Sequence, residues 1–500
     1  MAITPGGSLN SVPAPQKQTL ATNYLDLSST SGWGQQYVPD LMEKEAEVFG
    51  PRTISGFLAQ VGAEEAMTAD QVIWSEQGRL HLSYTGKVAA GGGATVNSVA
   101  ASVITIQKDI DGIAISSDGH GIRVNDMVIV SDANGITKCL VTAVAAATID
   151  VLPYDKGANA LTAQTTDNAT TILVFGSEYG KGAKYMDGGA ATTQSDSRGA
   201  NEPRMKSFSN KPIIMKDYYE VSGSDSSRVG WVEVTSEGGA SGFLWYLKAE
   251  SDTRARFADY LEMAMLESEL NDSSSVLDGS NTIVGSASGD GTVGTEGLFA
   301  AIESRGNLTS GITRVNAATD LAEFDAILAE FDNQGAIEEN MMFVNRATSL
   351  AMDDMLASMN SYGAGGTSYG VFNNSEDMAL NLGFSGFRRG SYDFYKSDMR
   401  YLNDKATRGG INAANTANAI RGVIIPAGTS SVYDQTVGQS MKRPFLHVRY
   451  RASQTDDRRM KTWTTGSVGA ATSALDAMQI HMLSERCLVT QGANNFMLMK

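Results

Sequence analysis

The stretch from Gly239 to Asp272, GASGFLWYLKAESDTRARFADYLEMAMLESELND, predicts the longest helix of the chain. Phe257 and Leu261 are four residues apart, and charged residues fill most of the positions between the apolar ones, which is the pattern of an amphipathic helix. Ser241 can serve as the N-cap, and the Asn-Asp-Ser-Ser-Ser run at the end stops the helix because these side chains compete for backbone hydrogen bonds. A helix over residues 241–271 would be about 45 Å long.

We expect the remaining parts of the chain to be arranged around this helix. Its apolar row at Phe257, Leu261 and Ala264 should pack on strands near the C-terminus of the same chain. A single long helix in a chain otherwise rich in short strands and Gly/Ser loops indicates a structural element rather than part of an enzyme core.

Composition limits the classes of function. The chain has 500 residues with 42% hydrophobic content, enough for about three domain-sized units. Its net charge of -17 and pI near 4.7 argue against broad nucleic-acid affinity, which needs an excess of Lys and Arg. The two cysteines, Cys139 and Cys487, exclude a disulfide framework. Without a signal peptide or a long apolar run, the sequence predicts synthesis and use in a cytoplasm.

The first half of the chain is expected to be mostly β. Short β-branched runs between residues 86 and 176 predict a separate β-barrel or sandwich, with a hairpin at Asn134-Gly135. The alternating segments Val72–Tyr84 and Pro212–Ser222 flank this block, and we expect them to pair as the two legs of a long polar hairpin that carries it. Residues 1–36, rich in Pro, Gly, Ser and Thr, predict an extended arm with no core of its own.

The second half reads as mixed α/β. An amphipathic helix is expected from Thr319-Asp320 onward, and the strand Asn340–Val344 leads into a further helix, ATSLAMDDMLASM. Strands return at the end of the chain, in FLHVRYRA, MKTWTT and CLVTQGANNFMLMK. The fold class is therefore α+β.

Two motifs suggest enzymes but lack the required context. Gly289–Gly294 matches GxGxxG, yet no tight strand-to-glycine turn or series of βαβ units accompanies it. Gly366–Gly370 matches GxSxG and would make Ser368 a nucleophile with His447 or His481, yet its flanks are loop-like rather than a strand and a helix. The four histidines share no metal-ligand spacing. We expect no catalytic, cofactor-binding or metal-binding residues.

One basic segment stands out, KRPFLHVRYRASQTDDRRMK at Lys442–Lys461. Its interleaved aromatic residues are compatible with nucleic-acid binding. The other interpretation is ion pairing between subunits, against acidic runs such as Glu43, Glu45 and Glu47 or Glu64 and Glu65. We favour ion pairing because the rest of the chain is acidic.

In its order of elements the chain resembles the major capsid proteins of tailed phages, the Hong Kong 97 fold. The local similarities are VPDLMEKEAEVFGPRTISGFL, VIWSEQGRLH, PRMKSFSNKPIIMKDYYEVSGSDSS, the long helix, GFSGFRRGSYDFYKSDMRYLND and the closing strands RPFLHVRYRA and CLVTQGANNFMLMK. VIWSEQGRLH is most similar to capsid proteins of large short-tailed, crAss-like phages.

The resemblance implies a division of the chain into an N-terminal arm (1–50), an extension loop and its base (51–85 and 177–237), an inserted β domain (86–176), a peripheral domain (238–280 and 441–500) with a spine helix at 241–271, and an axial domain (281–440). The insertion is a departure from the simplest family pattern. No long charged helical segment precedes the arm at Met1, so a separate scaffolding protein is expected.

The function implied by the resemblance is a shell subunit that forms hexamers and pentamers and closes an icosahedral head around double-stranded DNA. Expected partners are other copies, a scaffolding protein, a portal and decoration proteins, with DNA enclosed but not specifically bound, and no membrane. The chain would be located in the virion after assembly in the host cytoplasm. Two alternatives remain: an encapsulin-like compartment shell of the same fold, and a serine hydrolase using Ser368.

Overall fold

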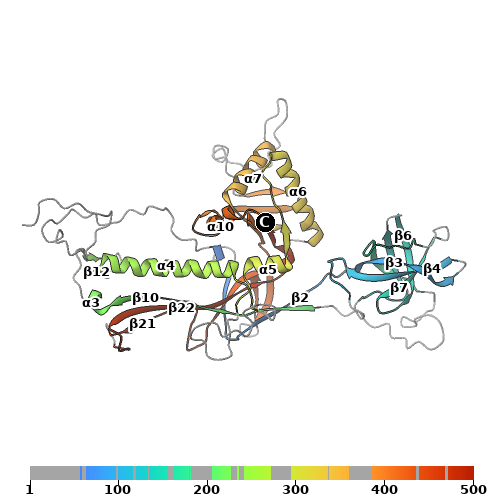
Figure 1. Ribbon diagram of the computed structural model, residues 1–500. Coiled ribbons are helices and arrows are strands. Elements are labelled where there is room, and N and C mark those ends of the chain that lie inside the picture. Colours follow the sequence, from blue (N-terminus) through green and yellow to red (C-terminus); the bar gives the residue numbers. More distant parts are fainter. Residues whose placement is uncertain are drawn as a thin grey trace, which may run out of the picture. The chain divides into compact units, whose positions relative to one another are not determined.

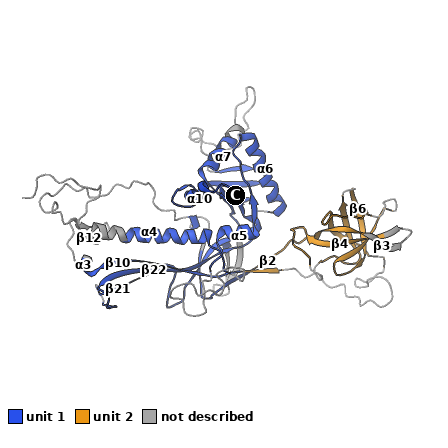
Figure 2. Cartoon of the chain, viewed as in Figure 1, with its two compact units in different colours: residues 1–74, 209–500 blue, residues 75–208 orange. Residues whose placement is uncertain are grey.

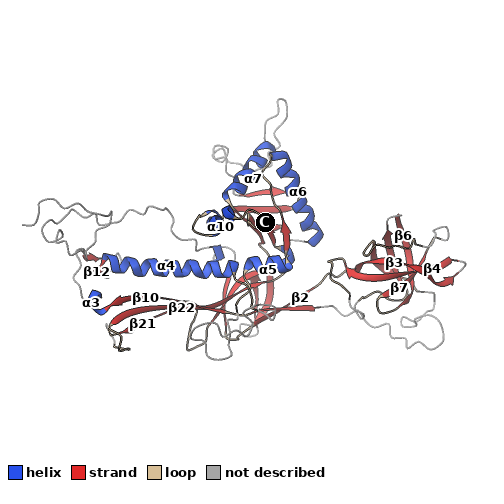
Figure 3. Cartoon of the chain, in the orientation of Figure 1, coloured by secondary structure: helices blue, strands red, loops and turns tan. Residues whose placement is uncertain are grey.

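The structure, a computed structural model, describes residues 57–58, 63–96, 99–115, 120–132, 135–155, 161–179, 181, 205–226, 233–235, 241–271, 294–335, 337–359, 386–434, 439–467 and 471–500. The chain divides into two compact units, residues 1–74 with 209–500, and residues 75–208 (Figure 2). We call them the helical unit and the barrel unit. Helices and strands both build the helical unit (Figure 3), so the α+β class is confirmed. The arm expected at 1–50 lies outside the described residues.

The long helix, α4, spans Leu244–Glu267. The prediction of a helix over 241–271 is wrong at both ends. Residues Ser241–Phe243 form strand β12, which pairs with β11 (Glu233–Thr235), so their backbone groups are used in a strand pair. At the other end Leu270 forms a β-bridge with Gly294. The helix is therefore about 36 Å long at 1.5 Å per residue.

Helix α4 lies along a sheet in the order β1-β20-β22-β10, with β21 also paired to β22 (Figure 1). The strands are β1 (Ala63–Met67), β10 (Ile213–Ser222), β20 (Leu446–Arg451), β21 (Lys461–Gly466) and β22 (Ala477–Thr490). Phe257 and Leu261 pack against Met482 of β22 and Met215 of β10, and Ala264 packs against the larger core nearby. The expectation that this row would face C-terminal strands is confirmed.

A second sheet has the order β13-β23-β17-β14-β16-β15. Its strands are β13 (Asn307–Thr309), β14 (Glu339–Val344), β15 (Gly386–Arg389), β16 (Tyr392–Asp398), β17 (Gly422–Pro426) and β23 (Met497–Met499). Helices α6 (Ala317–Gln334) and α7 (Arg346–Met359) share its hydrophobic core. Asn316 caps α6 by accepting from Thr319 N, so the helix starts two residues before the expected Thr319. The expected strand-then-helix unit is β14 and α7.

The barrel unit contains one closed barrel, in the order β3-β4-β7-β6-β5-β8. Its strands are β3 (Ser83–Val96), β4 (Val99–Asp109), β5 (Asp126–Asp132), β6 (Gly135–Val144), β7 (Thr148–Pro153) and β8 (Thr170–Ser177). Ile104, Val128, Val141 and Ile172 are among the fully buried side chains that fill it. The expected β-rich block forms this barrel, and β5 and β6 make the hairpin expected at Asn134-Gly135, where Gly135 has φ 144.

The strands on either side of the barrel pair differently from the expectation. Strand β2 (Val72–Gln77) pairs with β9 (Met205–Asn210), not with Pro212–Ser222. Residues from Ser83 onward belong to the barrel, while β10 pairs with β22 along its whole length. The prediction failed because alternate residues of β10, Met215 and Val221 among them, are turned inward against other apolar groups, so this strand belongs to a core sheet.

The remaining elements are short. They are α3 (Gly223–Ser226), α5 (Leu298–Arg305), α9 (Arg400–Asn403), α10 (Arg408–Ala414), the 3-10 turn Ala493–Asn495 and the strand pair β18 (Thr429–Asp434) with β19 (Gln439–Pro444). Glu267 at the end of α4 accepts from Tyr401 Oη at 2.9 Å and pairs with Arg408 at 2.8 Å, which ties α4 to α9 and α10. Across the described parts of the chain, no helix combines the length and hydropathy needed to span a membrane.

Candidate functional site

The structure does not bring the enzyme candidates together. Ser368 and most of the GxGxxG segment lie outside the described residues. His447 of β20 pairs with Val489 of β22. His481 lies on β22 eight residues before Val489 and pairs with Tyr218 of β10. Eight strand residues correspond to about 26 Å, so the two histidines cannot serve one site.

His481 lies between two aromatic rings on the sheet. Its ring stacks on Trp463 at 5.2 Å between centroids and on Tyr218 at 6.0 Å, and its Nε2 is 2.8 Å from Thr465 Oγ1. Around this stack the described residues form a shallow hollow of about 300 Å³ that also includes Lys216. Among the described residues the ring is hydrogen-bonded to the Thr465 hydroxyl but to no carboxylate, so the third group of a catalytic triad is missing.

His447 is buried and neutral. It is 2% exposed, and its Nδ1 is 3.1 Å from Pro444 O, so Nδ1 carries the proton and donates it to that carbonyl. Burial, with Arg449 adding to it, lowers the pKa of His447 to about 4. A histidine with this pKa would be a poor general base near neutral pH.

Burial of His447 predicts acid sensitivity. Below the ordinary pKa of 6.5 the unfolded chain takes up a proton that the folded chain does not bind until about pH 4. Stability is therefore complete above pH 6.5 and is lost as pH falls toward 4, by about 3 kcal/mol at most. The measurement is urea unfolding at pH 7.5 and 4.5. His447→Asn, which keeps a donor for Pro444 O, should show a smaller loss; an equal loss in both proteins would contradict this assignment.

The two cysteines are separate, buried thiols. Cys139 lies in the barrel and Cys487 on β22, both fully buried and unpaired by disulfide. Burial raises the pKa of each thiol to about 12, which leaves almost no thiolate at neutral pH. Among the described residues no group of His, Cys, Asp and Glu is arranged to hold a metal ion.

The basic segment at 442–461 is neutralised mainly by carboxylates of its own chain. On β1, Glu65 pairs with Arg443 and, at 3.1 Å, with Arg449 of β20. Strands β1 and β20 run parallel, and Glu65 is registered with Arg449. Burial lowers the pKa of Arg449, and Glu65 acts in the opposite sense. The prediction that Glu64 and Glu65 form ion pairs with the basic segment is therefore confirmed for Glu65. These pairs were expected between subunits, whereas the structure forms them within one chain.

A second group of pairs centres on Glu485, which is 5% exposed. It forms ion pairs with Arg451, at 2.8 Å between Oε1 and Nε, and with Arg458, at 2.9 Å between Oε2 and Nε. Arg451 also pairs with Asp70, which follows β1. A buried carboxylate is tolerated only when charged donors surround it, and here two arginines do so.

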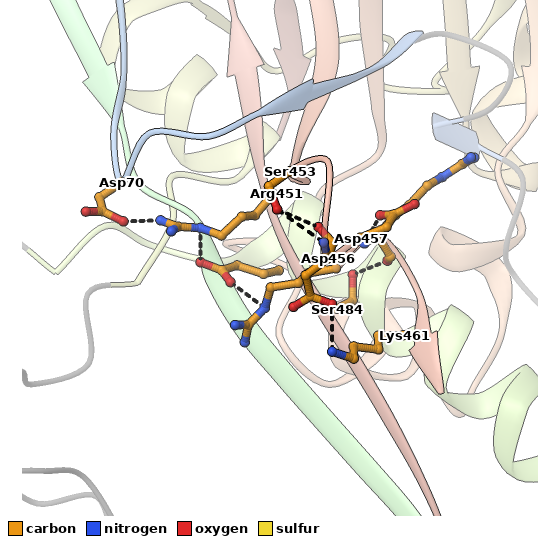
Figure 4. Close-up of polar contacts among 10 residues, drawn as sticks. Asp70, Arg451, Ser453, Asp456, Asp457, Lys461 and Ser484 are labelled. Atoms are coloured by element: carbon orange, nitrogen blue, oxygen red, sulfur yellow. Dashed lines mark hydrogen bonds and ion pairs between the residues drawn. The ribbon is translucent and has the colours of Figure 1, made fainter. Parts of the chain in front are cut away.

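The loop between β20 and β21 is held onto the sheet by the same network. Ser484 Oγ donates to Arg459 O at 2.7 Å, and Arg486 Nη2 donates to the same carbonyl at 2.9 Å. Arg459 pairs with Glu64, and Lys461 pairs with Asp456 at 2.6 Å (Figure 4). The described arginines of the segment thus fix β1, β20, β22 and this loop together, which leaves little of their charge for nucleic-acid phosphates.

Sequence reasoning missed Asp70, Glu485 and Arg486 as members of this network. The available signal was the charged Glu485-Arg486 pair inside the otherwise apolar strand HMLSERCLVT, because charged residues in a buried strand must be paired. What the sequence could not supply was the position of β1 beside β20.

No protein-family model and no curated protein matches this sequence. Among solved structures the chain is similar to the capsid of the cyanophage P-SCSP1u, at 7% identity and a TM-score of 0.37, covering 95% of each chain. It is similar to a chain of Microbacterium phage Oxtober96, at 9% identity and a TM-score of 0.35, covering 94% of this chain and 98% of that one. A third match is the capsid of a native GTA particle, at 10% identity and a TM-score of 0.34, covering 95% and 98%.

Proposed function

We propose that this chain is the major capsid protein of a tailed phage, which assembles into hexamers and pentamers that close an icosahedral shell around double-stranded DNA. The observation that carries the proposal is the arrangement of α4. One long helix lies on a sheet whose strands come from residues 63–67, 213–222 and 446–490, and this order of segments is the one on which the sequence resemblance rests.

The proposed division of the chain keeps the bounds that the sequence resemblance implies. The helical unit supplies a peripheral domain, 238–280 with 441–500, built on α4, and an axial domain, 281–440, built on the second sheet with α6 and α7. The paired strands β2 and β9 belong to the extension loop and its base, 51–85 with 177–237. The barrel is the inserted domain, 86–176, and residues 1–50 are the arm that lies over a neighbour.

Assembly of such a shell requires many weak contacts between identical copies. Each contact can be modest, because a closed shell makes every subunit multivalent toward its neighbours. The net charge of -17 favours a shell that encloses DNA without trapping it, and the paired basic segment supports the same conclusion. A separate scaffolding protein, a portal and decoration proteins are the further partners of this proposal, with assembly in the host cytoplasm and no enzymatic role.

The proposal is tested by electron microscopy of the purified chain expressed alone and together with a scaffolding protein. We expect closed shells or hexameric sheets of uniform size. A chain that remains monomeric at all concentrations would contradict the proposal. Shells that enclose host enzymes rather than DNA during infection would instead identify the compartment shell that the sequence left as an alternative.

A further inference from the structure

The outer wall of the barrel carries a continuous apolar surface. It is formed by outward-facing residues of four neighbouring strands, which we call the barrel stripe: Met127, Ile129, Ile136, Leu140, Leu152, Leu173 and Phe175. Ile136 is 73% exposed, Phe175 46% and Leu173 39%. The others are half-buried.

Strand register makes the stripe contiguous. Leu152 of β7 lies opposite Leu140 of β6, which lies opposite Met127 of β5. In the adjoining row Ile129 of β5 lies opposite Leu173 of β8. Directly opposed residues are about 5 Å apart, and Met127 and Ile129, two residues apart on β5, join the two rows into one apolar area over four strands, while Ile136 lies at its margin opposite Ser131.

The stripe is not a general property of this barrel. On the other wall, the outward positions of β3 and β4 hold Thr85, Lys87, Val103, Thr105 and Gln107, which are mainly polar. A folded domain gains nothing from an exposed apolar wall, and patches of this kind mark interaction surfaces. The barrel is closed, so its described strands offer no free edge for pairing, and only its walls can bind a partner.

We propose that the barrel stripe binds the helical unit of a second copy of this chain. Charge selects this occupant. Residues 75–208 contain acidic and basic residues in nearly equal numbers, so nearly all of the net charge of -17 belongs to the helical unit. Lys138 of β6 lies beside the stripe, opposite Ile129, and forms no ion pair with any described residue. A carboxylate of an acidic neighbour would neutralise Lys138 as the apolar side chains are covered.

This inference rests on the proposed function only in that a shell places other copies of the chain beside the barrel. The stripe assignment and the shell function can therefore fail separately. The test replaces Phe175 by the photo-crosslinking residue benzoylphenylalanine in the full chain and mixes isotopically light and heavy copies. Mass spectrometry of irradiated particles should show links between light and heavy chains that join position 175 to residues outside 75–208. The same replacement at Thr105 should give at most about a tenth as many links, because Thr105 lies on the polar wall, outside the proposed interface.

A charge substitution gives the energetic test. Leu173→Glu should raise the protein concentration needed for shell assembly about tenfold, because a carboxylate would be buried against an acidic neighbour, and Thr105→Glu should change it less than about twofold. Cys139 reports the fold of the barrel, because its buried thiol reacts with a thiol reagent only when the barrel opens.

The outcomes separate the two proposals. Normal shells in which position 175 links to nothing, or only to another barrel or to a different protein, would overturn the stripe assignment and leave the shell function standing. If the wild-type chain forms no shells, the proposed function fails, while links to the helical unit of a second copy in any smaller oligomer would still support the stripe.

Discussion

Asn210→Asp is expected to destabilise the helical unit by roughly 3–6 kcal/mol. The side chain of Asn210 is 1% exposed and takes part in five hydrogen bonds. Its Nδ2 donates to Glu296 O at 3.0 Å and to Leu488 O at 2.7 Å, and its Oδ1 accepts from Lys211 N, Thr295 Oγ1 and Glu296 N. Aspartate has nearly the same shape but loses both donors and places a negative charge beside two carbonyl oxygens.

The measurement is urea unfolding followed by tryptophan fluorescence. All five tryptophans lie in residues 1–74 or 209–500, so the signal reports the helical unit and not the barrel. Asn415→Asp, at an exposed position after α10, is the matched control and should change the free energy of unfolding by less than about 0.5 kcal/mol. Equal stability of the Asn210 variant and the wild type would show that this network does not hold β9, α5 and β22 together.

Phe257→Ala is expected to destabilise the same unit by about 3–5 kcal/mol, because it removes a fully buried ring and leaves a cavity. Phe257 is 1% exposed and packs with Leu261 of α4 against Met482 of β22. Under the proposed function this loss should also reduce the yield of shells, since α4 would no longer be fixed on its sheet.

Tyr260→Ala is the control on the same helix. Tyr260 is 43% exposed, so its removal should cost less than about 1 kcal/mol in the isolated subunit. Both variants are compared by urea unfolding of unassembled protein. A loss for Tyr260→Ala as large as that for Phe257→Ala would mean that the buried row of α4 has been wrongly identified.

The parts of the fold that could be predicted from sequence are those with strong local signals. The apolar spacing of α4, the strand-then-helix order of β14 and α7, and the β-branched runs of the barrel are all local. The start of α4 was misplaced because residues 241–243 pair with the nearby strand β11 instead of joining the helix, and its end because Leu270 forms a β-bridge with Gly294.

The pairing of strands and the ion-pair network could not be predicted. Strands β2 and β10 look alike as alternating segments, and each holds a buried residue, Trp74 in β2 and Val221 in β10, so their sequences do not show which partner strand each one takes. Glu485 likewise meets Arg451 and Arg458 only after β20 and β22 have paired. The contiguity of the barrel stripe depends on register across four strands, which no single strand reveals.

Strand β22 also has a consequence for the order of events during synthesis. It pairs with β10, β20 and β21, and β23, which follows it, is inserted between β13 and β17 in the other sheet. Both sheets of the helical unit are therefore completed by residues 477–499, long after β10 has been made. Contacts so distant in sequence form slowly, so a nascent chain should carry a folded barrel while its helical unit is still open. Such a chain would be unable to join a shell until translation has passed these strands, which delays assembly until each subunit is finished.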